Sequence, residues 1–201
     1  SVGLASGSSV GCGTVGNPAG PRAVEFAAMA GADLPVVPRK RITVEFDAAE
    51  PLVRDLPLTI DPTGIHVRSD GDAYMAGCTP DPDPTVAPDD FGMDDDIWED
   101  RVWPALAHRI PAFERIKVRT RWAGHYAHNR IDHNVIVGPH DEVANLIFAN
   151  GFSGHGVQQS PAIGRAVAEL IAHGRYVTLD LTPLGYGRVV AGEPFVERAI
   201  I

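Results

Sequence analysis

The segment Ser153-Gly154-His155-Gly156 brings together groups that could bind an anion or a polar ring. It follows an apolar run at 146–152 and precedes a helical pattern over 157–173. A helix that begins after a glycine-rich turn has backbone N–H groups without intrahelical partners, and its dipole adds partial positive charge. Ser153, Gly154 and Gly156 would let a ligand approach the backbone closely. Such turns also occur in α/β proteins for packing alone, so this pattern leaves both roles open.

Histidine and cysteine side chains suggest two further kinds of site. Neutral imidazole is a common metal ligand, and four histidines fall in one segment: His125, His128, His133 and His140. Their spacings match no zinc pattern, so no metal site is predicted. The two cysteines, Cys12 and Cys78, are too few for a disulfide framework or a four-thiolate metal site.

Residues 11–16, Gly-Cys-Gly-Thr-Val-Gly, formally match the GxGxxG pattern of dinucleotide-binding turns. That motif needs a strand before it and a helix after it. Small residues precede it here, and Asn17-Pro18-Ala19-Gly20-Pro21 follows, so prolines fall where the helix should begin. Residues 1–20 are therefore predicted to be a flexible lead-in.

Composition excludes several functional classes. The chain has 201 residues, of which 26 are acidic and 17 basic, for a net charge of −9. Non-specific nucleic-acid binding needs a basic surface, so no nucleic-acid partner is expected. No apolar run approaches the roughly 18 residues of a membrane span, and no signal peptide is visible. A cytoplasmic globular protein is expected, and the initial Ser suggests a piece excised from a longer chain.

Hydrophobic periodicity predicts the elements that must position these groups. Strands are expected at 42–46, 58–60, 65–68, 73–78, 116–122, 134–139 and 146–152. Helices are expected at 22–31, at 97–109 with a kink or boundary at Pro104, and at 157–173. The last has one apolar face, formed by Val157, Ile163, Val167, Leu170 and Ile171. Residues 79–96, rich in Asp and Pro, are predicted to be a solvated loop, and 123–133 a turn-rich segment. The fold class is α+β or α/β with a mixed, largely antiparallel sheet.

The segment Gly151–Gly164 closely resembles the C-terminal flavin-binding motif of the FAD-dependent D-amino-acid oxidase, sarcosine oxidase and glycine oxidase superfamily. Asn17–Pro21, Trp122–Tyr126 and Val135–Pro139 resemble further segments of that family, in the same order. The acidic loop, Trp103–Leu106 and the tail from Thr178 to Ile201 are most similar to the branch that includes the mitochondrial respiratory complex I assembly oxidoreductase.

The resemblance implies that this chain is the C-terminal half of such a protein. Residues 1–31 would be a remnant of the FAD-binding domain, 32–122 the substrate-binding sheet, and 123–201 the C-terminal part of the Rossmann-like FAD-binding domain. The family's GxGxxG unit with its ribose-binding Glu has no counterpart here. The resemblance therefore implies FAD as cofactor and leaves open whether this half retains it alone.

The resemblance also implies a set of site residues. His155 and Tyr126 would face the substrate. Gln158 falls where many relatives have a Lys near the flavin N1/O2 edge, and Gly124 where some have the cysteine that tethers FAD. The cofactor would contact Gly20, Gly138, Pro139, Ser153, Gly154, His155, Gly156, Val157 and Gln158.

The implied activity is oxidation of a C–N bond in an amino acid or secondary amine, with hydride passing to the flavin. The alternative, from another class, is a truncated non-catalytic fragment or assembly protein that acts through protein contacts. It would form a homodimer or bind a separate N-terminal half. A plain anion-binding module that uses the 153–156 turn is the third interpretation.

Overall fold

The computed structural model describes residues 1–198, which form two compact units. Unit 1 contains Ser1–Pro38 and the described residues from Tyr126 onward, and unit 2 contains Arg39–His125. The chain passes between the units in extended backbone both times. Strand β4 (Val36–Ala48) contains the first boundary, and strand β8 (Ile116–Asn129) contains the second.

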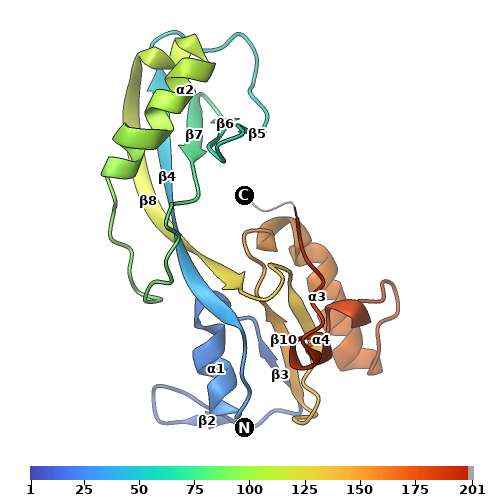
Figure 1. Ribbon diagram of the computed structural model, residues 1–201. Helices are drawn as coiled ribbons and strands as arrows, with labels where there is room; N and C mark the ends of the chain where they lie inside the picture. Colours follow the sequence, from blue (N-terminus) through green and yellow to red (C-terminus); the bar gives the residue numbers. More distant parts are fainter. Residues whose placement is uncertain (199–201) are drawn as a thin grey trace. The chain divides into compact units, whose positions relative to one another are not determined.

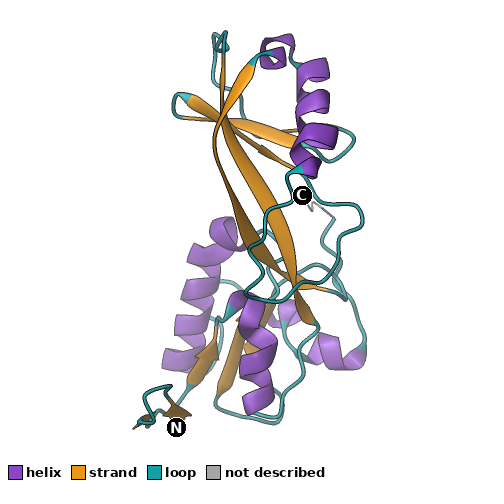
Figure 2. Cartoon of the chain, turned by 90° about the vertical axis from the view of Figure 1, so that its left-hand side faces the viewer, coloured by secondary structure: helices purple, strands orange, loops and turns teal. Residues whose placement is uncertain are grey.

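Unit 2 is built on a five-stranded sheet with the order β5-β6-β7-β4-β8. Strands β5 (Thr59–Ile60), β6 (His66–Asp70) and β7 (Ala73–Gly77) pair antiparallel, and β7 also pairs antiparallel with β4. A helical layer covers one side of these strands (Figure 2). It consists of a π-helical turn η2 (Trp98–Val102), helix α2 (Trp103–Arg109) and a 3₁₀ turn η3 (Pro111–Glu114).

The core of unit 2 follows from strand alternation. Val44, Phe46 and Ala48 on β4 point toward the helical layer, because successive side chains of a strand alternate between its faces. Phe46 stacks on Tyr74 with ring centres 5.6 Å apart and meets Phe113 edge-on at 5.2 Å. The predicted boundary at Pro104 is confirmed, since α2 begins one residue earlier, after the π-helical turn.

Unit 1 contains a three-stranded sheet with the order β3-β10-β9 (Figure 1). Strands β3 (Val15–Asn17) and β10 (Leu146–Asn150) are parallel, and β9 (Ile136–Pro139) is antiparallel to β10. Both parallel strands lead into helices. A 3₁₀ turn η1 (Gly20–Arg22) and α1 (Ala23–Met29) follow β3, and α3 (Gly156–His173) follows β10. The two helix starts therefore lie at the same edge of the sheet.

Shorter elements complete unit 1. Strands β1 (Val2–Gly3) and β2 (Ser9–Val10) form an antiparallel hairpin before β3. After α3 come a 3₁₀ turn η4 (Thr182–Leu184) and helix α4 (Gly187–Ala191). The mixed fold class with largely antiparallel pairing is confirmed.

Three expectations about elements were wrong. Residues 1–20 contain β1, β2 and β3 instead of a flexible lead-in, and the formal GxGxxG leads from β2 into another strand, β3, instead of into a helix. Residues 123–129 belong to β8, because a twisted strand need not alternate polar and apolar residues. The helix over 157–173 does not have one apolar face that includes all five predicted residues, because Val157 and Ile171 are 88% and 58% exposed. At 3.6 residues per turn Val157 lies about 120° and Ile171 about 80° around the helix from the buried Ile163.

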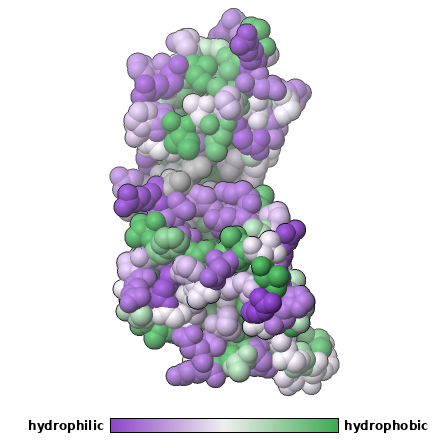
Figure 3. Space-filling model, turned by 90° about the vertical axis from the view of Figure 1, so that its right-hand side faces the viewer, coloured by the Kyte–Doolittle hydropathy of each residue, from purple (hydrophilic) through white to green (hydrophobic). Residues whose placement is uncertain are grey.

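The surface carries no extensive apolar layer on the side drawn in Figure 3. Green apolar patches there are small and separated by purple hydrophilic side chains. None of the helices in residues 1–198 combines the length and apolar character that crossing a bilayer requires.

Candidate functional site

The turn between β10 and α3 has an unusual backbone. Gly151 and Gly154 adopt positive φ angles of 73° and 103°, and Ser153 adopts 50°. Such angles suit glycine, but for serine they are uncommon and cost energy unless the surroundings hold them. The position of Ser153 therefore needs an explanation from its contacts.

Strand β8 and the turn itself supply those contacts. The Ser153 hydroxyl accepts a hydrogen bond from the Asn129 N–H at 3.0 Å and donates one to the Gly151 carbonyl at 3.2 Å. The Ser153 N–H donates to the Ala127 carbonyl at 3.0 Å. Only 1% of the serine is exposed. Two of these bonds fasten the turn to the end of β8, and the third, to Gly151, lies within the turn.

Tyr126 lies against the same turn. A Cβ added to Gly154 would stand 2.7 Å from the Cε2 and 3.0 Å from the Cζ of the Tyr126 ring. No real side chain fits at that distance, so the glycine is required by the ring as well as by its φ angle. The structure therefore brings together Tyr126 and Gly154, two of the predicted site residues.

Four more of the predicted site residues lie at the start of α3. His155 precedes the helix, and its N–H donates to the Phe152 carbonyl at 2.9 Å. Gly156 opens the helix, and Val157 and Gln158 follow it on the exposed first turn. Hence Gly154 through Gln158 form one exposed or half-buried stretch at the N-terminus of an 18-residue helix, directly after the buried Ser153.

Two buried asparagines at the carboxyl ends of β3 and β10 were missed from the sequence. The Asn17 side chain donates to the Ala23 carbonyl at 3.0 Å and accepts from the Ala19 N–H at 3.1 Å. The Asn150 amide donates to Asn17 Oδ1 at 3.4 Å, and the buried Oδ1 of Asn150 has no hydrogen-bond partner within the described part of the chain. Gly20, with φ of 55°, lies in the segment that Asn17 orders. The available sequence signal was the place of Asn150 at the end of the apolar run 146–149, whereas Asn17 follows no such run.

Gly138 and Pro139 lie elsewhere in unit 1. They pair with Phe148 and Ile147, toward the start of β10, whereas the turn follows its end. A Cβ on Gly138 would lie 3.0 Å from the hydroxyl of Tyr176, and Pro139 lines a cavity of about 630 Å³ beside the end of α3. The structure thus does not bring these two residues to the β10–α3 turn.

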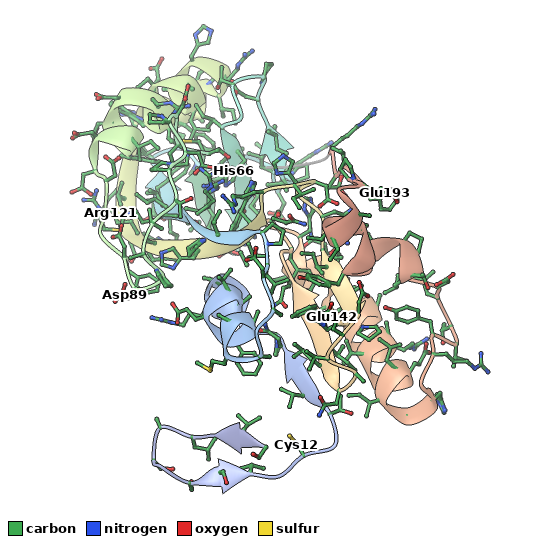
Figure 4. The ribbon with its side chains drawn as sticks, turned by 60° about the horizontal axis from the view of Figure 1, so that its bottom comes forward. Cys12, His66, Asp89, Arg121, Glu142 and Glu193 are labelled. Carbon is green, nitrogen blue, oxygen red and sulfur yellow. The ribbon has the colours of Figure 1, made fainter. Side chains whose placement is uncertain are left out.

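The four clustered histidines separate into three environments. In unit 2, His125 Nε2 lies 2.8 Å from the Asp90 carbonyl oxygen. In unit 1, His140 Nδ1 accepts hydrogen bonds from the N–H groups of Glu142 and Val143, while His128 and His133 contact each other at 3.1 Å. Residues 1–198 contain no group of three or more His, Cys, Asp or Glu arranged to hold a metal ion. Cys12 is exposed on the segment between β2 and β3 (Figure 4).

A buried ion pair supports the end of β8, and the sequence did not reveal it. Arg188 Nε donates to Asp132 Oδ2 at 2.8 Å, with both side chains almost fully buried. Burial alone would raise the pKa of Asp132, but Arg188 and the N–H groups of Phe195 and Asn134 hold that pKa below its ordinary value. The partners are 56 positions apart in the chain, so no local pattern connects them.

Comparison with known proteins places this geometry in a family. The model of the family described as FAD dependent oxidoreductase (DAO) matches residues 2–170. The chain belongs to the DAO family of FAD-dependent oxidoreductases. The resemblance found in its motifs is therefore confirmed.

Curated relatives share the name FAD-dependent oxidoreductase domain-containing protein 1. The Bos taurus protein is 43% identical over 175 residues, which are 86% of this chain and 36% of the relative. The Xenopus laevis protein is 45% identical over 173 residues, 85% of this chain and 35% of the relative. The chain thus spans about a third of the length of these relatives.

Two solved structures, of an L-proline dehydrogenase and a glycine oxidase, have the same fold as this chain. The L-proline dehydrogenase of P. horikoshii superimposes with a TM-score of 0.78 at 28% identity, covering 90% of this chain and 48% of that one. The glycine oxidase of Geobacillus kaustophilus gives 0.75 at 23% identity, covering 86% and 44%.

The residues at the carboxyl edge of the sheet fit an FAD cofactor. In open α/β sheets, ligands bind outside the carboxyl ends of the strands. Here that edge carries a glycine at φ 103°, an exposed first helical turn and the buried, unsatisfied amide oxygen of Asn150. An unsatisfied buried acceptor costs free energy, which a donor from a ligand or water would recover.

Proposed function

We propose that this chain contributes the C-terminal part of an FAD-dependent enzyme that oxidises a C–N bond in an amino acid or secondary amine. The observation that carries the proposal is the strained β10–α3 turn, fastened to β8 by Ser153 and closed on the Tyr126 ring. The names of two structural relatives support the same class of substrate, since one is an L-proline dehydrogenase and the other a glycine oxidase.

The chain's own residues would position the ligands and stabilise negative charge. Gly154 permits close approach because it has no side chain, and the N–H groups at the start of α3 would face negative charge. The Gln158 amide can donate a hydrogen bond without supplying charge. The Tyr126 hydroxyl would bind the substrate carboxylate, and His155 would border the substrate. When bound, FAD supplies the two-electron acceptor for amine oxidation.

The test is retention of flavin by the full chain after excess FAD and desalting, followed by its visible absorption. Gly154→Ala is the diagnostic variant because its Cβ would collide with Tyr126. Gly164→Ala is the matched control, since it lies on α3 with open space around the added methyl group. We expect retention by the wild type and by the control, and at least tenfold weaker retention by Gly154→Ala.

Two results would contradict this proposal. Equal retention by Gly154→Ala and wild type would remove the turn from the flavin site. No retention by any form, also after a GxGxxG-bearing half of a relative is added, would favour the assembly or binding interpretation. Size-exclusion chromatography of the same samples would then report whether the chain acts as a homodimer.

A further inference from the structure

We propose that His128 and His133 form a binding site for one late first-row divalent transition-metal ion, with water completing its coordination. Both residues belong to unit 1, His128 on β8 and His133 in the loop that follows it. The flavin site proposed above does not use this pair.

The distance between the two nitrogens suits a shared ion. His133 Nδ1 lies 3.1 Å from His128 Nε2. A zinc ion about 2.05 Å from both nitrogens would subtend an N–metal–N angle of about 98° at this spacing. That angle lies between the octahedral and tetrahedral values, so both ligands could bind one ion without moving apart.

The orientation of the rings points the same way. Their centres are 4.7 Å apart, with the planes inclined by 51°. A straight N–H···N bond at this length would separate the centres by roughly 5.3 Å, because the bond angle prefers to exceed about 150°. Two imidazoles that share an ion in their ring planes would have centres about 4.8 Å apart. The observed spacing matches shared coordination more closely than a straight hydrogen bond.

The loop that carries His133 is held in place by its own bonds. His133 has a φ angle of 58°, uncommon for a residue with a side chain. Its N–H donates to the Asn129 carbonyl at 3.1 Å, and the Asn129 amide donates to Asp132 Oδ1 and to the Asn134 carbonyl, each at 2.7 Å. A strained position held by its surroundings is a recurrent feature of binding sites, and here it fixes one ligand opposite the other.

The ligand types set the class of metal. Two neutral imidazoles suit Cu²⁺, Ni²⁺ and Zn²⁺, whereas Mg²⁺ and Ca²⁺ prefer oxygen ligands. Asp132, the nearest carboxylate in the sequence, is committed to Arg188. The pair should therefore bind Ni²⁺, a metal that suits imidazole ligands, and should not bind Mg²⁺.

The first experiment is calorimetric titration of the tag-free full chain with Ni²⁺, and with Mg²⁺ in parallel. We expect one saturable Ni²⁺ site. His133→Asn should weaken it about tenfold or more, because one of two protein ligands is lost, while Asn tolerates the positive φ. His173→Asn is the matched control, an exposed histidine in the last turn of α3, and should bind as the wild type does.

A second measurement does not depend on any variant. Zn²⁺ added to ¹⁵N-histidine-labelled wild type should shift the resonances of His128 Nε2 and His133 Nδ1 and leave those of His108 and His173 unchanged. Absence of a saturable Ni²⁺ site, unchanged binding by His133→Asn, or Zn²⁺ shifts confined to other histidines would each overturn the proposal. The pair would then be a bent hydrogen bond that shares one proton.

Discussion

The two units are stabilised by different kinds of core. In unit 2, Phe46, Tyr74, Trp98 and Phe113 pack ring against ring between the sheet and its helices. By contrast, unit 1 contains every buried polar or charged side chain found among the described residues: Asn17, His128, Asn129, Asp132, His140, Asn150, Ser153 and Arg188. The charged groups of unit 2 lie at least partly exposed, as in the Arg119 pairs with Glu45, Asp47 and Asp72.

The two kinds of core differ in how closely they fix the position of the backbone. Hydrophobic burial is non-directional, so an apolar core tolerates small shifts of its elements. Hydrogen bonds and buried ion pairs depend on geometry, and an unsatisfied member is costly. The polar groups of unit 1 hold the ends of β3, β8 and β10, the elements that carry the candidate site. Unit 1 therefore uses its polar core to fix backbone at a defined place.

The largest expected effect is from Asp132→Asn in unit 1. Removing this carboxylate leaves Arg188 buried without its counter-charge, which typically costs about 3–5 kcal/mol of folding free energy. Urea unfolding followed by far-UV circular dichroism measures it. Glu50→Gln is the control, because the Glu50–Arg115 pair is highly exposed and should change stability little. A loss for Asp132→Asn no larger than that of the control would contradict the polar-core account of unit 1.

Ser153→Ala tests the hydrogen bonds by which the Ser153 hydroxyl holds the β10–α3 turn. The change leaves the buried Asn129 N–H without its acceptor, at a cost of about 1–3 kcal/mol. Ser153→Gly loses the same hydroxyl but relieves the positive φ, so it should cost less than Ser153→Ala. Thermal unfolding of both variants measures the order. The reverse order would show that the φ angle contributes nothing.

In unit 2, Phe46→Leu should cost about 1–2 kcal/mol, from lost apolar volume and a lost aromatic pair. All three tryptophans, Trp98, Trp103 and Trp122, belong to unit 2. Their emission during urea unfolding therefore reports this core. An unchanged midpoint for Phe46→Leu would show that the ring contacts are not the main source of its stability.

The same contrast explains what the sequence could predict. The strands of unit 2 were located because apolar and polar residues alternate, as in Val44, Glu45 and Phe46. The length of β8 was missed because the residues that continue it, such as Gly124 and Ala127, have no such alternation. The alternation of a strand is a local property, and its continuation depends on a neighbouring strand.

The candidate site was predictable to the same degree. The glycine-rich β10–α3 turn followed from its motif, and glycine at 154 has a local cause in its φ angle. The contact of this turn with the Tyr126 ring was not predicted. The roles of Asn150 and of the Asp132–Arg188 pair depend on partners that are distant in the chain. Single-residue types give no sign of such pairing, which is why the polar core of unit 1 appeared only in three dimensions.

The smallest expected effect is a difference in pH response between the units. Burial, with the nearby charge of Arg41, lowers the pKa of His66 in unit 2 below its ordinary 6.5, and its buried Nδ1 has no partner within residues 1–198. A histidine with a lowered folded-state pKa binds protons more readily when unfolded. Its stabilising contribution is therefore present above pH 6.5 and declines as the pH falls below that value.

Urea unfolding of unit 2, followed by tryptophan emission between pH 7.5 and pH 5, measures this decline. His66→Gln should abolish it, whereas His108→Gln, at an exposed position of α2, should keep it. Asp132 in unit 1 carries an acid instead of a base, but its contribution to stability also declines as the pH falls. Its lowered carboxyl pKa keeps its contribution until the pH falls below the ordinary Asp range of about 3.9. Unit 2 should thus weaken at mildly acidic pH, where the ion pair of unit 1 is still intact, and a decline that survives in His66→Gln would remove that distinction.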